Sequence, residues 1–404
     1  MKLFVAGAAL CASALAVEQR DSVLGELSAA SEGFVRMPMK MSSRLGHSSD
    51  VEKELAGIAS KMASKGKGLL AVDESTKTIG KRLAGIGVEN TEANRKAYRN
   101  LLFTCPGLGD FISGAILYEE TLYQSGPNGG KPFVDALKDN GILPGIKVDT
   151  GLQPLFGASD GEVWCTGLDG LYERAVQFKN QGAQFAKWRA TVQIDPASGM
   201  PSDLAIQEVA HGLARYARIM QAARLVPIVE PEILMDGAHN IAVTAHIQEK
   251  VLSTVYKALA DNNVFLEGTI LKPSMTTPGS DCGEEVTAQD IASTTLRTLE
   301  RCVPCAVPGI TFLSGGMSEE EASVNLNIMN QMPRKGPWSV SFSYGRALQQ
   351  SCLKAWKGKE ENIPAAQNAL LARARANGQA SMGKYVAGSE PSDDTTLFVK
   401  GYKY

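Results

Sequence analysis

The residues best suited to chemistry are charged side chains that interrupt short apolar runs. Lys272 lies in the run LEGTILKP, and Lys187 lies in FAKWRATV. A nucleophilic lysine must lose its proton, and burial near another cation favours the neutral amine. Addition of that amine to a carbonyl gives a carbinolamine and then an iminium, which is an electron sink for breaking a carbon–carbon bond. The pattern favours Schiff-base chemistry at Lys272.

Carboxylates occupy similar positions in other apolar runs. Glu230 and Glu232 are two residues apart in VPIVEPEI, and alternate residues of a strand project from the same face. Two neighbouring carboxylates can have separated pKa values, so that one serves as an acid and the other as a base. Asp73 ends the run GLLAVD and adds a third carboxylate.

A glycine-containing segment is typical of a phosphate site. Residues 314–316 (SGG) follow an apolar run and lead to Ser318, where a helical pattern opens. Small residues let backbone N–H groups approach a phosphate, and a helix N-terminus favours negative charge. Arg346 comes just after the last apolar run, where barrel enzymes often add a phosphate ligand.

Eight short apolar runs are predicted to be strands, with helical patterns such as Leu204–Gln221 between them. Buried strands that alternate with helices favour a single-domain TIM (β/α)8 barrel. A doubly wound parallel sheet is the alternative, and the lack of a Gly-x-Gly-x-x-Gly turn counts against it. The predicted strands are residues 68–73, 113–118, 145–149, 185–192, 226–233, 266–273, 309–316 and 338–345.

The carboxyl ends of the predicted strands carry charged and small polar residues. Barrel enzymes place their chemistry at this end, and charged residues are almost never buried without partners. Opposite charges delivered to one mouth indicate an acid–base site for an anionic substrate. These residues are Asp73, Lys147, Lys187, Arg189, Glu230, Glu232, Lys272, Ser314, Gly315, Ser343 and Arg346.

The composition is that of an ordinary globular protein. Of 404 residues, 44% are hydrophobic and 21% charged, and the net charge is −2, which permits a large core. This balance argues against nucleic acid or a membrane as the main partner. Seven scattered cysteines do not form a disulfide framework, and four histidines leave little for a metal site. We expect no metal and no other cofactor.

The two ends of the chain differ from the middle. Residues 1–17 combine Lys2 with an apolar run and small-residue steps, as in a cleaved signal peptide. Residues 18–49 look like a transit-type leader, so the pair predicts plastid import, and internal methionines leave a cytoplasmic form as the alternative. We expect the barrel to span residues 50–376. Residues 377–404, rich in Gly and Ser, are predicted to be a mobile tail.

Taken together, these motifs resemble the class I fructose-1,6-bisphosphate aldolases. The resemblance implies a lyase that cleaves fructose 1,6-bisphosphate reversibly to dihydroxyacetone phosphate and glyceraldehyde 3-phosphate. It also implies that the protein is a homotetramer and that its binding partner is its substrate, a small sugar bisphosphate. The matching segments run in order from about Val51 to Tyr404: LLAVDEST, KRL, GIKVD, FAKWR, VPIVEPEIL, LEGTILKP, GITFLSGG with SEEEA, and FSYGRALQ.

The resemblance implies roles for the catalytic residues. Lys272 would form the Schiff base, and Glu230 would handle protons while the carbinolamine forms and dehydrates. Asp73, beside Lys187, would take the proton of the C4 hydroxyl during cleavage. Glu232 would orient and polarise this cluster.

The resemblance also implies residues that act around the reacting carbons. The terminal Tyr404 matches a tyrosine with which the family ends, and its phenol would protonate the enamine left after cleavage. The C1 phosphate would lie at the glycine segment and the C6 phosphate on the opposite side. The substrate and phosphate ligands would be Ser314, Gly315 and Arg346 for C1, Lys147 and Arg189 for C6, and further Lys81, Arg82 and Ser343.

Two other functions fit part of the pattern. A transaldolase-like barrel would use the same lysine chemistry, but it handles a monophosphate sugar and lacks cationic groups at both ends of the site. A non-catalytic scaffold would not need Asp73, Lys187, Glu230 and Lys272 together. Activity on a bisphosphate against a monophosphate separates the two enzymes, and borohydride trapping on a lysine separates an enzyme from a scaffold.

The iminium predicts an activity that needs no metal, because it supplies the electron sink that zinc supplies in metal-dependent aldolases. Dialysis against a chelator should leave the cleavage rate unchanged. Loss of activity on dialysis, followed by recovery on adding zinc, would contradict this expectation.

Overall fold

The computed structural model describes residues 49–401, so most of the predicted leader and Tyr404 lie outside the described residues. In this part of the chain, eight parallel strands close into a barrel in the order β1-β10-β9-β8-β7-β6-β3-β2. The predicted TIM barrel is confirmed, and the doubly wound alternative is wrong. The barrel strands are β1 Gly68–Val72, β2 Ile112–Leu117, β3 Leu143–Lys147, β6 Phe185–Val192, β7 Val226–Ile233, β8 Ile270–Leu271, β9 Gly309–Phe312 and β10 Ser339–Tyr344.

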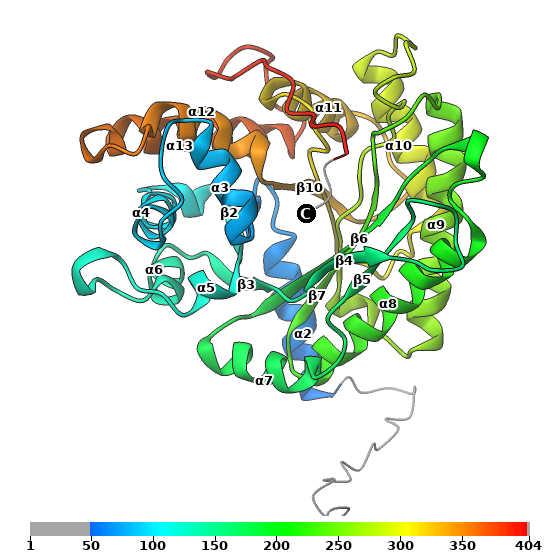
Figure 1. Cartoon of the computed structure of the whole chain (residues 1–404), viewed down its shortest axis with the longest axis horizontal. Helices are drawn as coiled ribbons and strands as arrows, with labels where there is room; N and C mark the ends of the chain where they lie inside the picture. The colour runs from blue at the N-terminus through cyan, green and yellow to red at the C-terminus, as the bar shows by residue number, and fades with distance from the viewer. Residues whose placement is uncertain (1–48, 402–404) are drawn as a thin grey trace, which may run out of the picture. The chain divides into compact units, whose positions relative to one another are not determined.

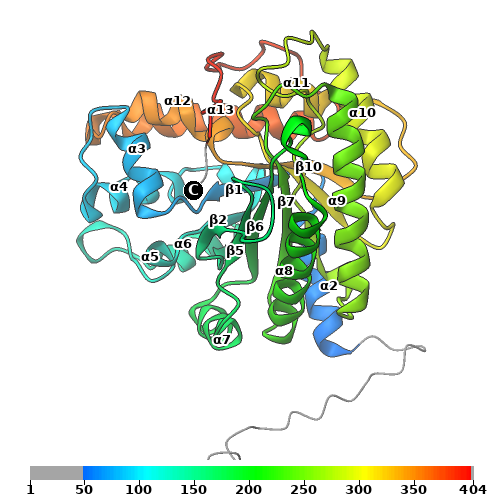
Figure 2. The ribbon, with the colours of Figure 1, turned by 45° about the vertical axis from the view of Figure 1, so that its right-hand side comes forward.

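Helices surround the strands and give the barrel its outer layer (Figure 1). Helices α8 and α9 run side by side along the outside of β7 (Figure 2). Within residues 49–401, no helix has both the length and the apolar character needed to cross a membrane. The helices are α2 Asp50–Met62, α3 Thr76–Ala84, α4 Glu92–Phe103, α5 Glu119–Leu122, α6 Phe133–Asp139, α7 Leu171–Gln181, α8 Asp203–Ala222, α9 Ile241–Asp261, α10 Ala288–Cys302, α11 Glu319–Gln331, α12 Arg346–Trp356 and α13 Ile363–Ala380.

The interior of the barrel, toward the amino-terminal ends of its strands, is filled by one aromatic ring packed against glycines. Phe185 on β6 is fully buried. A Cβ atom added at Gly145 on β3 would lie 2.2 Å from the Phe185 ring, and one at Gly114 on β2 would lie 2.9 Å from it. Glycine on these two strands therefore leaves the room that the ring fills, and the core keeps its close packing.

Helix α2 packs against the amino-terminal end of the barrel. Its buried residues include Leu55, Ile58 and Met62, which are spaced three or four residues apart and so share one face of the helix. They cluster with interior side chains of the strands, among them Phe185 and Ile270. The opposite end of the barrel, where the strands finish, remains available for polar side chains.

The sixth predicted strand is shorter than the apolar run that predicted it. A 3-10 turn at Leu266–Gly268 precedes the two residues of β8. The amide of Gln221 on α8 donates to the carbonyls of Phe265 at 2.7 Å and Gly268 at 3.3 Å. A side chain is thus hydrogen-bonded to backbone carbonyl groups that, in a longer strand, would accept hydrogen bonds from a neighbouring strand. The hydrophobic run could not reveal this, because Gln221 lies on the preceding helix.

A β-hairpin after β3 was not predicted. Strands β4 (Gly151–Pro154) and β5 (Val163–Thr166) pair in antiparallel fashion outside the barrel. Both strands are short and largely exposed, so their residues carry little of the apolar pattern that marks buried strands.

The end of the chain is also more structured than its composition suggests. Helix α13 continues to Ala380, beyond the predicted boundary at residue 376. After it, Tyr385 and Leu397 are buried, and the Asp393 backbone N–H donates to the Glu319 carboxylate at 2.8 Å. Residues up to 401 therefore have defined contacts, although their sequence is rich in turn-forming residues.

Packing against Phe185 predicts that alanine is destabilising at Gly145 but not at a glycine with open space around it. Gly145→Ala should lower the free energy of unfolding by about 1–3 kcal/mol, because the new methyl group overlaps the ring. Gly212→Ala on α8 is the matched control: its Cβ meets nothing within 4 Å, and alanine favours a helix by roughly 0.5–1 kcal/mol. Urea unfolding at one protein concentration measures both. A neutral Gly145→Ala would contradict the packing described.

Candidate active site

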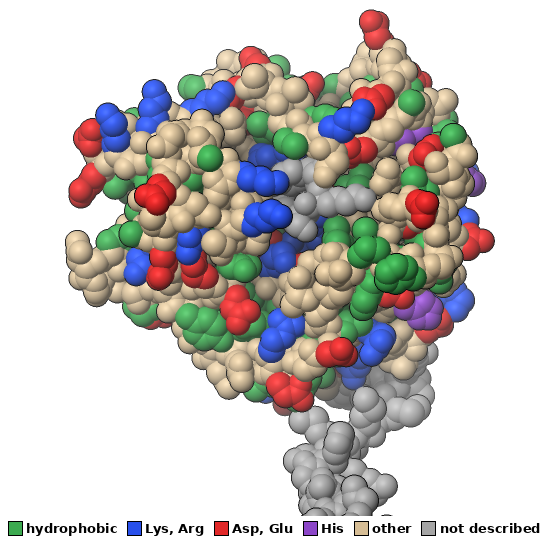
Figure 3. Space-filling view, in the orientation of Figure 1, with side chains coloured by type: hydrophobic (Ala, Val, Ile, Leu, Met, Phe, Trp, Pro, Cys, Tyr) green, Lys and Arg blue, Asp and Glu red, His purple; other side chains and the backbone are tan. Residues whose placement is uncertain are grey.

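A cavity of about 320 Å³ opens at the carboxyl ends of the barrel strands. Lys and Arg side chains gather near the centre of this face (Figure 3). Most of the predicted site residues line it, although Lys81 is exposed on α3 and does not, and Tyr404 lies outside the described residues. The predicted residues that line it are Asp73, Arg82, Lys147, Lys187, Arg189, Glu230, Glu232, Lys272, Ser314, Gly315, Ser343 and Arg346.

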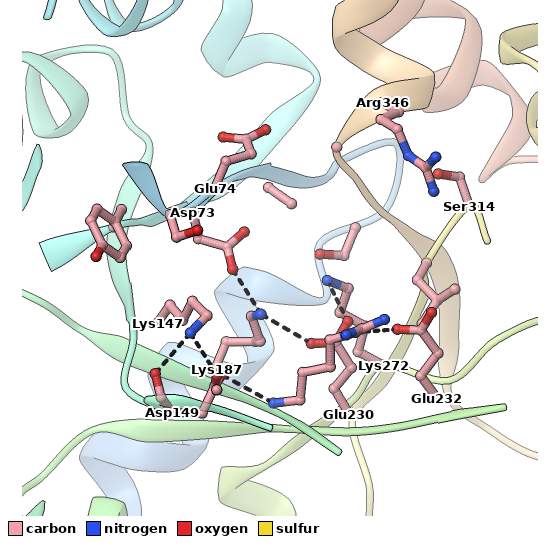
Figure 4. Close-up of a pocket in the computed structure, with 18 of the residues that line it drawn as sticks. Asp73, Glu74, Lys147, Asp149, Lys187, Glu230, Glu232, Lys272, Ser314 and Arg346 are labelled. Carbon is pink, nitrogen blue, oxygen red and sulfur yellow. Dashed lines mark hydrogen bonds and ion pairs between the residues drawn. The ribbon is translucent and has the colours of Figure 1, made fainter. Parts of the chain in front are cut away.

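Four charged side chains form a continuous chain of ion pairs in this cavity (Figure 4). Lys187 Nζ lies 2.7 Å from Asp73 Oδ2 and 3.4 Å from Glu230 Oε2. The other oxygen of Glu230 lies 2.9 Å from Lys272 Nζ. Asp73 follows β1, Lys187 and Glu230 belong to β6 and β7, and Lys272 follows β8. Barrel closure therefore joins four segments that are far apart in the sequence.

The electrostatics distinguish Lys187 as a fixed cation. Burial alone would lower the pKa of Lys187, but the carboxylates of Asp73 and Glu230 raise it well above its ordinary value. Burial alone would raise the pKa of Asp73, but Lys187 and Lys272 lower it to about 2. Both groups are therefore charged at neutral pH. A lysine held in the protonated state is a poor nucleophile, which leaves Lys272 as the better candidate.

Two further ion pairs lie beside these four linked charges. Arg189 Nε donates to Glu232 Oε2 at 2.5 Å, and this cation keeps the pKa of Glu232 low against the effect of burial. Lys147 Nζ lies 2.5 Å from Asp149 Oδ1. Asp149 was not predicted as a site residue, although it stands two residues after Lys147 in the GIKVD motif. Its position at the strand end is the signal that could have identified it.

Glu74 is another residue that the sequence reasoning missed. It is buried directly after Asp73, and it forms ion pairs with Arg82 and, at 2.7 Å, with Arg99. Arg99 is also buried, whereas Arg82 faces the cavity. Glu74 therefore anchors the predicted ligand Arg82 at the cavity wall. Its place directly after a strand-end aspartate was the available signal.

The candidate phosphate turn differs in detail from the sequence expectation. Gly315 and Gly316 both have positive φ, which glycine adopts without strain. The N-terminus of α11, however, is satisfied by its own capping box: Ser318 N–H donates to the Glu321 carboxylate at 2.8 Å. The donors that remain for a phosphate are those of the turn and of Arg346, whose guanidinium also donates to the carbonyl of Leu397.

Ser343 adds a polar group at the same end of the cavity. Its side chain is buried, and its hydroxyl has no hydrogen-bond partner within the described part of the chain. A buried polar atom without a partner is costly, so a ligand atom is the natural partner for it.

Among residues 49–401, no three His, Cys, Asp or Glu side chains are grouped so that they could hold a metal ion. The cysteines of this part of the chain are all free.

Comparison with known proteins gives one consistent family. The family described as fructose-bisphosphate aldolase class-I matches residues 54–404. Fructose-bisphosphate aldolase 1 of Toxoplasma gondii is 59% identical over 358 residues, covering 88% of this chain and 98% of that protein. The cytoplasmic isozyme of Spinacia oleracea is 58% identical over 87% of this chain and 97% of its own. Chloroplastic aldolase 1 of Arabidopsis thaliana is 57% identical over 87% of this chain and 86% of its own.

A solved structure agrees with these relatives. The fructose-bisphosphate aldolase of Plasmodium falciparum, crystallised with TRAP and a small-molecule inhibitor, superposes with a TM-score of 0.82. It is 55% identical, and the match covers 84% of this chain and 97% of that one.

The low pKa of Asp73 predicts a pH-dependent stability. A carboxyl group with a depressed folded-state pKa stabilises the fold above its unfolded pKa, and this contribution is lost as the pH falls through the folded value. A shift from 3.8 to about 2 is worth about 2 kcal/mol, of which about half is lost by pH 3. Asp73→Asn should therefore show a smaller loss of unfolding free energy between pH 5 and pH 3. An unchanged pH slope would argue against this ion pair.

Proposed function

The chain belongs to the class-I fructose-bisphosphate aldolase family, and from this premise we propose that Lys272 carries the reaction as a Schiff-base nucleophile. The reaction is the reversible cleavage of fructose 1,6-bisphosphate to dihydroxyacetone phosphate and glyceraldehyde 3-phosphate, a step of glycolysis, gluconeogenesis and the Calvin cycle. The observation that carries the residue assignment is the ion-pair chain Asp73–Lys187–Glu230–Lys272. It supplies a nucleophile, two carboxylates and a permanent cation around one cavity.

The first stage joins substrate and enzyme. Glu230, 2.9 Å from Lys272 Nζ, first takes a proton from the ammonium, and the free amine adds to the C2 carbonyl. Glu230 passes this proton to the C2 alkoxide, which gives the carbinolamine hydroxyl. It then takes the second proton from the C2-bound nitrogen and delivers it to that hydroxyl, which leaves as water. The product is an iminium between Lys272 and C2.

The second stage breaks the C3–C4 bond. Asp73, ionised because of its low pKa, accepts the proton of the C4 hydroxyl. The electrons of the C3–C4 bond move to the iminium nitrogen, so glyceraldehyde 3-phosphate leaves and an enamine stays on Lys272. Lys187, 2.7 Å from Asp73, holds this carboxylate in place. Glu232, held by Arg189, polarises the cluster from the neighbouring position on β7.

The final stage protonates the enamine, and we assign it to Tyr404. This residue lies outside the described part of the chain, but the preceding segment supports the assignment. Leu397 N–H donates to the Gly316 carbonyl at 2.9 Å, and Gly401 N–H donates to Asp236 at 2.6 Å. Gly316 directly follows the cavity-lining residues Ser314 and Gly315, so the described part of the tail passes beside the cavity. Hydrolysis of the iminium then releases dihydroxyacetone phosphate.

The two ends of the cavity suit the two phosphates of the substrate. The turn with Ser314 and Gly315, together with Arg346, would bind the C1 phosphate, and the Ser343 hydroxyl would meet a polar substrate atom. Lys147 and Arg189 would lie beside the C6 phosphate. Arg82, anchored by Glu74, is a further ligand, whereas the exposed Lys81 has no support as one.

We propose that the protein is a homotetramer, as the family resemblance implies. The hairpin and the start of α8 expose large apolar side chains: Phe156 is 90% exposed, and Trp164 and Leu204 are also accessible. A Cβ atom added at Gly157, the residue after Phe156, would lie 3.6 Å from the Leu204 side chain, so the loop and α8 are neighbours here. A cluster of this kind is typical of an interface, and a second copy of the chain would cover it.

Relatives of this chain include both chloroplastic and cytosolic enzymes. We propose plastid import, with residues 1–17 as a signal peptide and residues 18–49 as a transit-type leader. A start at an internal methionine such as Met37 would give the cytoplasmic form instead.

Replacement of the nucleophile tests the assignment. Lys272→Met nearly preserves the side-chain volume but removes the amine, so cleavage should fall by several orders of magnitude while the circular dichroism spectrum is retained. Lys257→Met, a change of an exposed lysine on α9, should leave turnover unchanged. Substantial turnover by Lys272→Met would place the nucleophile elsewhere, with Lys187 as the first suspect. If wild-type protein fails to cleave fructose 1,6-bisphosphate, the scaffold alternative replaces the enzyme.

A further inference from the structure

The positive charges that face the C6 end of the cavity are not equally available. Lys147 lies 2.5 Å from Asp149, and Arg189 lies 2.5 Å from Glu232. Each of these cations is therefore largely balanced by a carboxylate. A phosphate placed beside them gains less attraction than it would beside a cation without a carboxylate partner.

Arg174 on α7 is such a cation. It lines the cavity, yet it forms no ion pair with any carboxylate in residues 49–401. Its Nη2 donates two hydrogen bonds to backbone carbonyls, of Val148 at 3.2 Å and of Gly167 at 2.7 Å. Carbonyl groups orient the guanidinium without cancelling its charge. The Nη1 and Nε donors remain for a ligand, since a guanidinium carries five N–H groups.

These two hydrogen bonds also fix which end of the cavity Arg174 serves. Val148 directly follows Lys147, and Gly167 directly follows the hairpin strand β5. The guanidinium therefore lies on the Lys147 side. Ser314 and Arg346 lie on the other side of the cavity (Figure 4).

We infer that Arg174 binds the C6 phosphate and is a determinant of the preference for a bisphosphate over a ketose 1-phosphate. This inference rests on the proposed function and deepens it. The guanidinium presents a planar set of donors that suits phosphate oxygens. Because its orienting acceptors directly follow β3 and the hairpin strand β5, it is already positioned before the substrate arrives.

The test compares two substrates that differ only at C6. Arg174→Gln should raise KM for fructose 1,6-bisphosphate by about 10- to 100-fold, as expected for loss of a charge-assisted contact. Its KM for fructose 1-phosphate should stay within about 2-fold of wild type. Arg174→Lys should recover part of the loss, because it restores the charge but not the planar donors. Arg301→Gln, at an exposed arginine of α10, is the matched control.

Two results would overturn the inference. An unchanged KM for the bisphosphate would remove Arg174 from the phosphate site. Equal losses on both substrates, together with a lowered Tm, would mean that Arg174 only clamps the hairpin to β3. Borohydride trapping with dihydroxyacetone phosphate, which has no C6 phosphate, reports on the proposed function separately. An unlabelled wild type would contradict that function, whereas a labelled wild type with an unchanged KM for Arg174→Gln would remove Arg174 alone.

Discussion

The site depends on one buried cation, Lys187, that lies between two carboxylates. Lys187 lies between Asp73 and Glu230, and these two carboxylates hold it protonated. Lys272 Nζ contacts Glu230 and forms no ion pair with another carboxylate in residues 49–401, so Glu230 is the neighbouring group that can accept its proton. The single positive charge of Lys187 lies between Asp73 and Glu230 and stabilises both carboxylates. Removing one member would therefore leave a buried charge without its partner, which is strongly unfavourable.

The barrel meets this constraint by its register. Strands β6 and β7 pair Lys187 with Ile228 and Arg189 with Glu230. Each cation of β6 therefore reaches the glutamate two residues beyond its register partner, so that Lys187 contacts Glu230 and Arg189 contacts Glu232. Small residues on β2 and β3 make room for Phe185, and α2 packs against the amino-terminal end. The apolar amino-terminal half of the barrel thus supports the polar half at the carboxyl ends of the strands. Hydrophobic packing fixes the backbone, and the fixed backbone places charges that could not otherwise be held together.

Much of this site could be predicted from the sequence, because strand ends in a barrel point to one mouth. Lys272, Glu230 and Asp73 each end or follow an apolar run, and all three line the cavity. Arg174 could not be predicted in this way, since it lies on a helix and reaches the cavity through its side chain. The shortness of β8 depends on Gln221, which is distant in sequence. The periodicity of a strand indicates which of its own residues are buried, but it does not reveal contacts with helices that are distant in sequence.

We propose that Lys272, and not Lys187, forms the covalent intermediate. The most direct measurement is reduction with borohydride in the presence of dihydroxyacetone phosphate, followed by mass-spectrometric mapping of the modified peptide. A single adduct on Lys272 is expected, with Lys187 unmodified because its proton is held by two carboxylates. An adduct on Lys187, or the absence of any lysine adduct, would contradict this proposal.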